Sequence, residues 1–195
     1  SAKPAGTAIT ISIAGIVNPP YGLITDDFTI NTQSANQSDI DSGTADGVEI
    51  TAGQLSGVSV TSSSSNYTVG EETSYRIAFT TVNAIGVGGQ IKVTFDSDYG
   101  FSLDGSVSGN SGATASVSNN VVTITLGTAV SASEAVNLTL GTFTNPGYAQ
   151  ETDSFSVKTY DSEGNALDSG TGAGLSISSG SLTGIQGVAL GIVCL

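Results

Sequence analysis

The sequence contains no histidine, methionine or tryptophan, and its only cysteine is Cys194. Without histidine there is no side chain whose ordinary pKa lies near neutral pH, so Ser-His-Asp, Cys-His and His-metal chemistries are excluded. A single cysteine allows no disulfide within the chain. Paired carboxylates of the kind that hydrolyse glycosides remain available. From these absences we predict that the protein is not an enzyme.

Positive charge is also scarce, since 4 Lys and Arg face 17 Asp and Glu and the net charge is −13. Nucleic-acid binding requires basic side chains that neutralise phosphates, so we expect no nucleic-acid partner. Anionic membrane surfaces are disfavoured for the same reason, and no apolar run of about 18 residues predicts membrane insertion. An acidic surface suits a secreted protein and leaves carboxylates free for divalent cations.

The most informative feature that is present is an internal repeat. Residues 6–58 align with residues 133–185 without a gap, at an offset of about 127 residues, and 17 of the 53 aligned positions are identical. The identities include Asn18 and Asn145, Pro19 and Pro146, Tyr21 and Tyr148, Asp26 and Asp153, and Phe28 and Phe155. The chain is therefore predicted to hold about one and a half copies of the repeat. Residues 1–58 form an incomplete half unit, and residues 59–185 form a complete unit.

Alternation of apolar and polar residues predicts strands throughout the chain. It is clearest in residues 9–13, 28–31, 75–79, 91–95, 122–126, 136–140 and 155–158. Gly-Gly, Asp-Gly and Asn-Pro turn signals separate these segments, and no segment shows a helical period. We therefore predict an all-β fold, an antiparallel Ig-like β-sandwich.

The order of these segments resembles a known architecture. The complete unit has a strand, a Gly-Gly hairpin, a strand ending in Phe-Asp, a Gly/Ser-rich region and a stretch of the form NPxYxxxTDxFxVxT. This order resembles the Ig-like β-sandwich repeats of large microbial extracellular proteins. It is also similar in design to self-assembling extracellular fibril subunits, including pilus-like filaments built by strand exchange. The resemblance is one of pattern over residues 6–185, and it implies an extracellular or cell-surface structural protein.

The end of the chain departs from the repeat. Residues 186–195 form an apolar segment in which Val188, Leu190 and Ile192 share one face of a predicted strand. An exposed apolar strand promotes aggregation unless it is donated to a neighbour, and a head-to-tail contact that does not close generates a filament. The predicted assembly residues are Ile185, Val188, Leu190, Ile192 and Cys194, the last as an intermolecular crosslink.

Alternatives to strand donation remain open. Residues 186–195 can instead be the last strand of their own sheet, and residues 7–17 alternate well enough to be the donor. The expected partner is another copy of this chain in a helical homopolymer. The alternative function is a repeat module, a stalk or carbohydrate-binding adhesin, of a larger cell-surface protein of which this chain is one slice.

Two kinds of smaller motif are present. Asn36, Asn66 and Asn137 begin Asn-x-Ser/Thr sequons, which predict N-linked glycans in a secreted protein. Asp96, Asp98 and Asp104 alternate near glycine, a pattern that can surround Ca²⁺ although the full twelve-residue loop is missing. Asp39, Asp41 and Asp46 form a weaker cluster of the same kind. Solvated turn carboxylates are the simpler interpretation of both clusters, and no other cofactor is expected.

Overall fold

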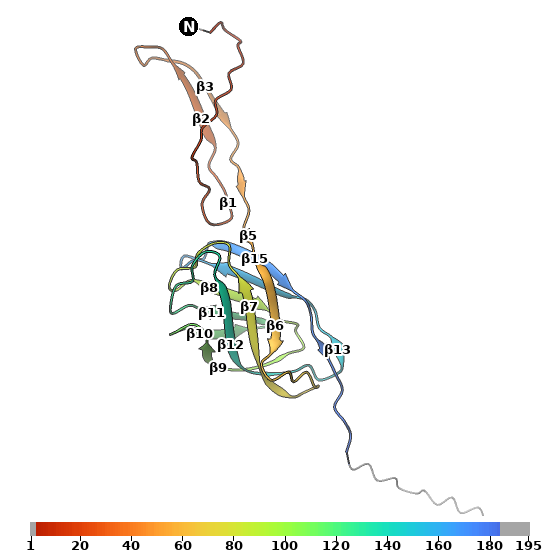
Figure 1. Cartoon of the computed structure of the whole chain (residues 1–195). Coiled ribbons are helices and arrows are strands. Elements are labelled where there is room, and N and C mark those ends of the chain that lie inside the picture. Colours follow the sequence, from red (N-terminus) through yellow and green to blue (C-terminus); the bar gives the residue numbers. More distant parts are fainter. Residues whose placement is uncertain (1–2, 184–195) are drawn as a thin grey trace, which may run out of the picture. The chain divides into compact units, whose positions relative to one another are not determined.

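The structure is a computed structural model that describes residues 3–183. These residues form strands and no helix, which confirms the predicted all-β fold. No helix in this described range is long and apolar enough to cross a membrane. The chain divides into two compact units, Ser1–Thr51 and Ala52–Leu195 (Figure 1).

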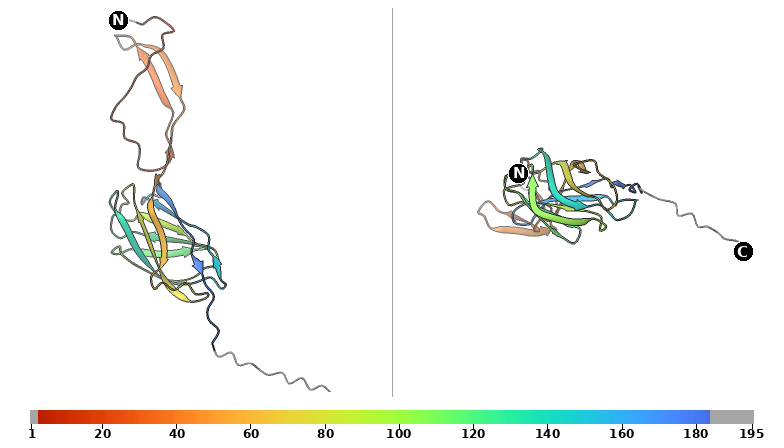
Figure 2. Two further views of the ribbon diagram at one scale, coloured as in Figure 1. Left: turned by 45° about the vertical axis from the view of Figure 1, so that its right-hand side comes forward. Right: turned by 90° about the horizontal axis from the view of Figure 1, so that it is seen from below.

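The first unit consists of two antiparallel strand pairs, β2 with β3 and β1 with β4. Residues 3–22 carry no strand and are drawn as a loop in Figure 2. The bounds are β1 (Leu23–Ile24), β2 (Phe28–Gln33), β3 (Asp39–Ala45) and β4 (Glu49–Ile50).

The second unit is a β-sandwich, as the alternation predicted. Its boundary precedes the end of the repeat at residue 58, because β5 already pairs with β15. The bounds are β5 (Gly53–Gln54), β6 (Ser56–Ser62), β7 (Glu72–Thr80), β8 (Gln90–Thr94), β9 (Gly100–Ser108), β10 (Thr114–Ser118), β11 (Val121–Thr125), β12 (Ala135–Thr144), β13 (Gln150–Glu151), β14 (Phe155–Tyr160), β15 (Ala166–Gly172) and β16 (Ser176–Ile177).

The sandwich strands follow the order β5-β15-β14-β8-β11-β10-β9-β12-β7-β6. β10 and β9 meet through a single residue pair, Thr114 with Ser106, and this link separates two layers. One layer runs from β5 to β10 and the other from β9 to β6. All of these strand pairs are antiparallel except β5 with β15, which is parallel.

The core lies between these layers, on the faces that the alternation predicted. Tyr75 and Ile77 of β7 and Val93 of β8 have no exposed surface. An aromatic cluster fills one end of the core, where Phe95 lies 4.9 Å from Phe143 and 5.2 Å from Phe155 between ring centroids. Because such rings bury large areas and pack edge to face, this cluster contributes strongly to the stability of the second unit.

The two stretches aligned in the sequence fold in the same way. Leu23 pairs with Ile50 in the first unit, and Gln150 pairs with Ile177 at the equivalent positions of the second. β2–β3 and β14–β15 share one register, including a register shift that follows Thr32 in one hairpin and Thr159 in the other. The number of repeat copies stays a prediction, but the aligned halves have one local architecture.

The hairpin turns are alike as well. Gln37 has a φ of 63° and its counterpart Gly164 a φ of 91°, so both occupy the left-handed region. Glycine adopts this conformation without strain, whereas glutamine does so at a cost. The two turns therefore share a left-handed residue, although only the second turn has glycine there.

Candidate functional site

The first unit exposes apolar side chains whose counterparts form the core of the sandwich. Ile11 is 73% exposed and its counterpart Leu138 1%, while Phe28 is 50% exposed and its counterpart Phe155 0%. The same contrast holds for Ile9 and Val136, Ile13 and Leu140, Ile16 and Phe143, Ile30 and Val157, and Ile40 and Leu167. Contiguous exposed apolar side chains of this size mark an interaction surface.

The contrast arises because the first unit lacks the strands that cover these positions. In the sandwich, β12 lies between β7 and β9, and β14 lies between β15 and β8. Strands β7, β8 and β9 all belong to residues 52–132, which we call the first half of the sandwich. Residues 8–17, which align with β12, form no strand. An isolated strand has no partner for its backbone groups, so its absence here is expected.

One contact within the sandwich joins the start of the first half to β15. Gly53 pairs with Asp168 in the parallel register, and the Leu55 N–H donates to the Ser169 carbonyl at 2.8 Å. Leu55 is 4% exposed. A Cβ on Gly170 would lie only 2.8 Å from the Leu55 Cβ. The leucine can therefore approach β15 only because residue 170 is glycine.

Both sides of this contact occur a second time in the chain. Asp41–Gly43, which we call the acceptor segment, aligns with residues 168–170 and is identical to it. Gly180–Leu182, the donor segment, aligns with residues 53–55 and keeps the glycine and the leucine. A Cβ on Gly43 would meet nothing within 4 Å, and Leu182 is 84% exposed. Among the described residues, Gly43 and Leu182 thus lack the close contact that Gly170 and Leu55 make with each other.

Two buried polar side chains also join the halves of the sandwich. The Asp168 carboxylate accepts hydrogen bonds from the Val82 N–H at 3.2 Å, the Asn83 N–H at 3.1 Å and the Asn83 Nδ2 at 2.8 Å. Asn145 accepts from the Tyr75 hydroxyl at 2.7 Å and donates to the Thr68 carbonyl at 2.9 Å. Burial and the hydrogen bond with Tyr99 raise the pKa of Tyr75 above its usual value. Its hydroxyl therefore stays protonated as a donor.

Asn18 and Asp41, the counterparts of these two side chains, are exposed. Asp41 retains only the local part of the arrangement, in which its N–H donates to the Thr32 Oγ1 at 3.1 Å, as Asp168 does to Thr159 at 3.0 Å. The first unit therefore keeps the apolar and polar residues whose counterparts join the two halves of the sandwich, but in the first unit these residues are exposed.

The carboxylates predicted to bind calcium accept hydrogen bonds within the protein. Asp98 accepts from Tyr148 and Gln150, and Asp104 accepts from Ser106. These hydrogen bonds lower the pKa of Asp98 and of Asp104 below the usual value. Among residues 3–183, no three His, Cys, Asp or Glu side chains are grouped to hold a metal ion. Calcium binding at these residues stays a prediction.

The weaker acidic cluster behaves similarly. Asp39 accepts from the Gln33 Nε2 at 2.8 Å and Asp41 from the Thr32 Oγ1 at 3.2 Å, across the β2–β3 hairpin. Asp46 lies in the loop between β3 and β4. These contacts are those of a polar hairpin surface.

The sequon asparagines differ in their surroundings. Asn36 is exposed in the β2–β3 turn, and Asn137 is exposed on β12, where its Oδ1 accepts from Arg76. Asn66 is partly buried, and its Oδ1 accepts from the Thr68 N–H at 3.1 Å. Glycosylation of all three stays a prediction.

The predicted assembly residues Ile185, Val188, Leu190, Ile192 and Cys194 lie outside the described residues. The sequence analysis did not single out Asn18, Gly43 or Leu182 as interface candidates, and it considered Asp41 only as a calcium ligand. Their signal was the set of identities between repeats, which becomes interpretable only once the contacts of the second copy are seen.

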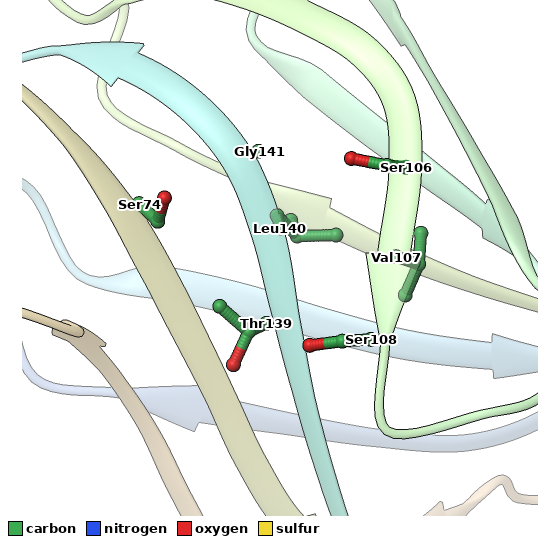
Figure 3. Close-up of a pocket in the computed structure, with 7 residues that line it drawn as sticks. All are labelled: Ser74, Ser106, Val107, Ser108, Thr139, Leu140 and Gly141. Atoms are coloured by element: carbon green, nitrogen blue, oxygen red, sulfur yellow. The ribbon is translucent and has the colours of Figure 1, made fainter.

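A hollow of about 230 Å³ lies beside the register shift of β12. Figure 3 shows its lining on neighbouring strands of one layer, with hydroxyl, aliphatic and glycine residues only. The lining comprises Ser74, Ser106, Val107, Ser108, Thr139, Leu140 and Gly141. None of these is ionisable, so they supply no acid, base or charged ligand-binding group.

Comparisons with known proteins give fold likeness alone. No protein-family model matches the chain, and no curated protein matches it. BslA, a bacterial hydrophobin, is 13% identical, with a TM-score of 0.47 over 67% of this chain and 98% of its own. A putative membrane-anchored protein from Corynebacterium diphtheriae is 13% identical, with a TM-score of 0.37 over 78% of this chain and 45% of its own.

A non-cellulosomal cohesin from the archaeon Archaeoglobus fulgidus is 12% identical, with a TM-score of 0.32 over 62% of this chain and 90% of its own. Identities and TM-scores at this level assign no function to the chain. Its function is therefore argued from its own surfaces.

Proposed function

We propose that the protein is a structural subunit of an extracellular filament that polymerises head to tail by β-strand complementation. The observation that carries the proposal is the unfilled acceptor segment, Asp41–Gly43, together with the exposed donor segment, Gly180–Leu182. Their counterparts, Asp168–Gly170 and Gly53–Leu55, contact each other inside the sandwich, which supports a contact of the same kind between subunits.

The proposed junction copies that internal contact. The donor segment of one subunit lies parallel to the acceptor segment of the next, with Leu182 over Gly43 and its N–H donating to the Ser42 carbonyl. Residues 186–195, which the sequence analysis predicts to be donated, follow the donor segment after residues 183–185. Because donor and acceptor are different surfaces, the contact is heterologous and repeats without limit unless it closes into a ring.

The composition suits this role. A protein with a net charge of −13 is kept soluble before assembly, and pairing of its exposed apolar positions removes an aggregation hazard. The proposed role requires no catalytic group. Secretion to the cell surface or beyond it is part of the proposal, as the resemblance to extracellular repeats implies.

Substitution at Gly43 tests the junction. Gly43→Val adds a side chain where Leu182 would lie, yet in the monomer a Cβ there meets nothing within 4 Å. The control is Gly86→Val in the second unit, where a Cβ likewise meets nothing within 4 Å. Negative-stain electron microscopy and sedimentation should show filaments from the original chain and from Gly86→Val, but not from Gly43→Val.

Leu182→Asp tests the donor side, and Val87→Asp is its control because Val87 is an exposed valine elsewhere in the second unit. We expect the first to abolish filaments and the second to leave them intact. Monodisperse monomers of the original chain under all conditions, or filaments from both Gly43→Val and Leu182→Asp, would refute the junction.

The second candidate function is a repeat module of a larger cell-surface protein, either a stalk or a carbohydrate-binding adhesin. The internal repeat favours it, because adjacent repeats of one polypeptide would fill the same donor and acceptor positions. It predicts that the chain stays monomeric at every concentration, which the same sedimentation experiment measures.

A further inference from the structure

The exposed face of the first unit carries polar groups that the donor segment would leave uncovered. The counterpart of the donor segment, Gly53–Leu55, lies along β15 and makes backbone and leucine contacts there. Asn145 instead binds Tyr75 on β7 and Thr68 before it, while the Asp168 carboxylate binds the turn at Val82 and Asn83.

These partners lie on elements that one strand cannot replace. Tyr75 lies within β7, and Val82 and Asn83 lie in the turn that follows it. A single donated strand in the position of β5 and β6 supplies neither a tyrosine hydroxyl on the next strand nor a pair of turn N–H groups. Asn18 and Asp41 would then remain unpaired in a newly buried interface, which is costly.

The identities support a larger occupant. Asn18 and Asp41 keep the residue types of Asn145 and Asp168, although on the isolated first unit both are exposed. The apolar positions of the same face keep their character too, as with Phe28 and Phe155. An occupant that matched only the apolar side chains would not require an amide and a carboxylate at these two places.

We infer that the donor segment fills only the acceptor segment, and that the rest of this face is covered by a polypeptide segment built like the first half, residues 52–132, from a further copy of the repeat. It presents a tyrosine hydroxyl to Asn18 as Tyr75 does to Asn145, and a turn with two backbone N–H groups to Asp41. The inference rests on the proposed function in taking the first unit as an acceptor, and it names the partner that completes it.

An extended chain tests the inference. A second copy of residues 52–132 is placed directly before Gly6, which preserves the repeat spacing and supplies a first half to the first unit. Hydrogen exchange should then show the amides of β2 and β3 protected to the same degree as those of β14 and β15. In the original chain, kept dilute and monomeric, β2 and β3 should exchange at least 100-fold faster than β14 and β15.

Substitutions at Asn18 and Asp41 test whether the added copy protects β2 and β3 through contacts with these two side chains. In the extended chain, Asn18→Ala and Asp41→Ala should each raise exchange in β2 and β3 at least tenfold. In the monomeric original chain they should leave exchange unchanged. The control is an extended chain whose added copy carries the equivalent of Ile77→Asp, which prevents that copy from forming a core and should leave β2 and β3 unprotected.

The outcomes distinguish the inference from the proposed function. If the added copy folds but β2 and β3 still exchange as in the original chain, or if Asn18→Ala and Asp41→Ala have no effect, the inference is wrong. Failure of the original chain to form filaments would refute the proposed function alone. If the extended chain forms filaments as well as the original chain, its filled acceptor segment is not the junction, and only the head-to-tail contact is refuted.

Discussion

Replacement of Asp168 by alanine should destabilise the sandwich far more than replacement of Asp41 destabilises the first unit. Asp168 is 1% exposed, and its carboxylate accepts three donors from Val82 and Asn83 at 2.8–3.2 Å. Hydrogen bonds to a charged group contribute about 1.5–3 kcal/mol each, but they are not additive. Val82 is exposed, so water can reach part of the vacated turn. The expected loss is therefore about 2–4 kcal/mol in the free energy of unfolding.

Urea denaturation and thermal unfolding of both variants measure this difference. Asp168→Ala should lower the midpoint temperature of the sandwich by on the order of 10 °C. Asp41→Ala should change the midpoint temperature of unfolding of the chain by less than about 1 °C. An exposed carboxylate that accepts one local hydrogen bond contributes little to stability. Equal effects of the two substitutions on the monomer would refute the reasoning, because the two positions would then have equivalent surroundings.

Two further predictions concern the core and the acidic turn. Leu138→Ala should reduce the free energy of unfolding by about 2–5 kcal/mol through loss of buried surface and a residual cavity, whereas Ile11→Ala should leave the monomer unchanged in denaturant titrations. A large effect of Ile11→Ala would show that its side chain is already packed. The Asp98 pKa lies below 3.8 because of hydrogen bonds from Tyr148 and Gln150, so its contribution to stability is present above that value and is lost as pH falls through the lowered pKa. Tyr148→Phe should raise the Asp98 pKa towards 3.8 in a carboxyl NMR titration, and an unchanged pKa would contradict the assignment.

The strands of the sandwich could be predicted because alternation identifies which face of a strand is apolar. Tyr75, Ile77 and Val93 were all expected to face inward, and all are buried. The same alternation at Ile9, Ile11 and Ile13 predicts an apolar face equally well, but it cannot indicate whether a covering sheet is present. Whether an apolar face is buried depends on the rest of the sheet, which in this case the first unit lacks.

The candidate site was harder to predict from the sequence than the strands. The repeat alignment showed identical residues at Asp41 and Asp168, but a short acidic pattern alone suggested calcium binding. Only the position of the turn at Val82 and Asn83 explains why a carboxylate is needed there. Likewise the closeness of Leu55 to Gly170 depends on a parallel pairing between segments more than a hundred residues apart, which local periodicity does not reveal.

Hydrogen exchange of the original chain across a range of protein concentrations tests the central claim most directly, because it reports whether the acceptor segment in β3 becomes paired with another subunit. The account predicts fast exchange in β3 at low concentration and progressive protection of β3 as the chain assembles, with β14 and β15 protected throughout. Fast exchange in β3 within fully assembled material would contradict it, as would strong protection in the dilute monomer.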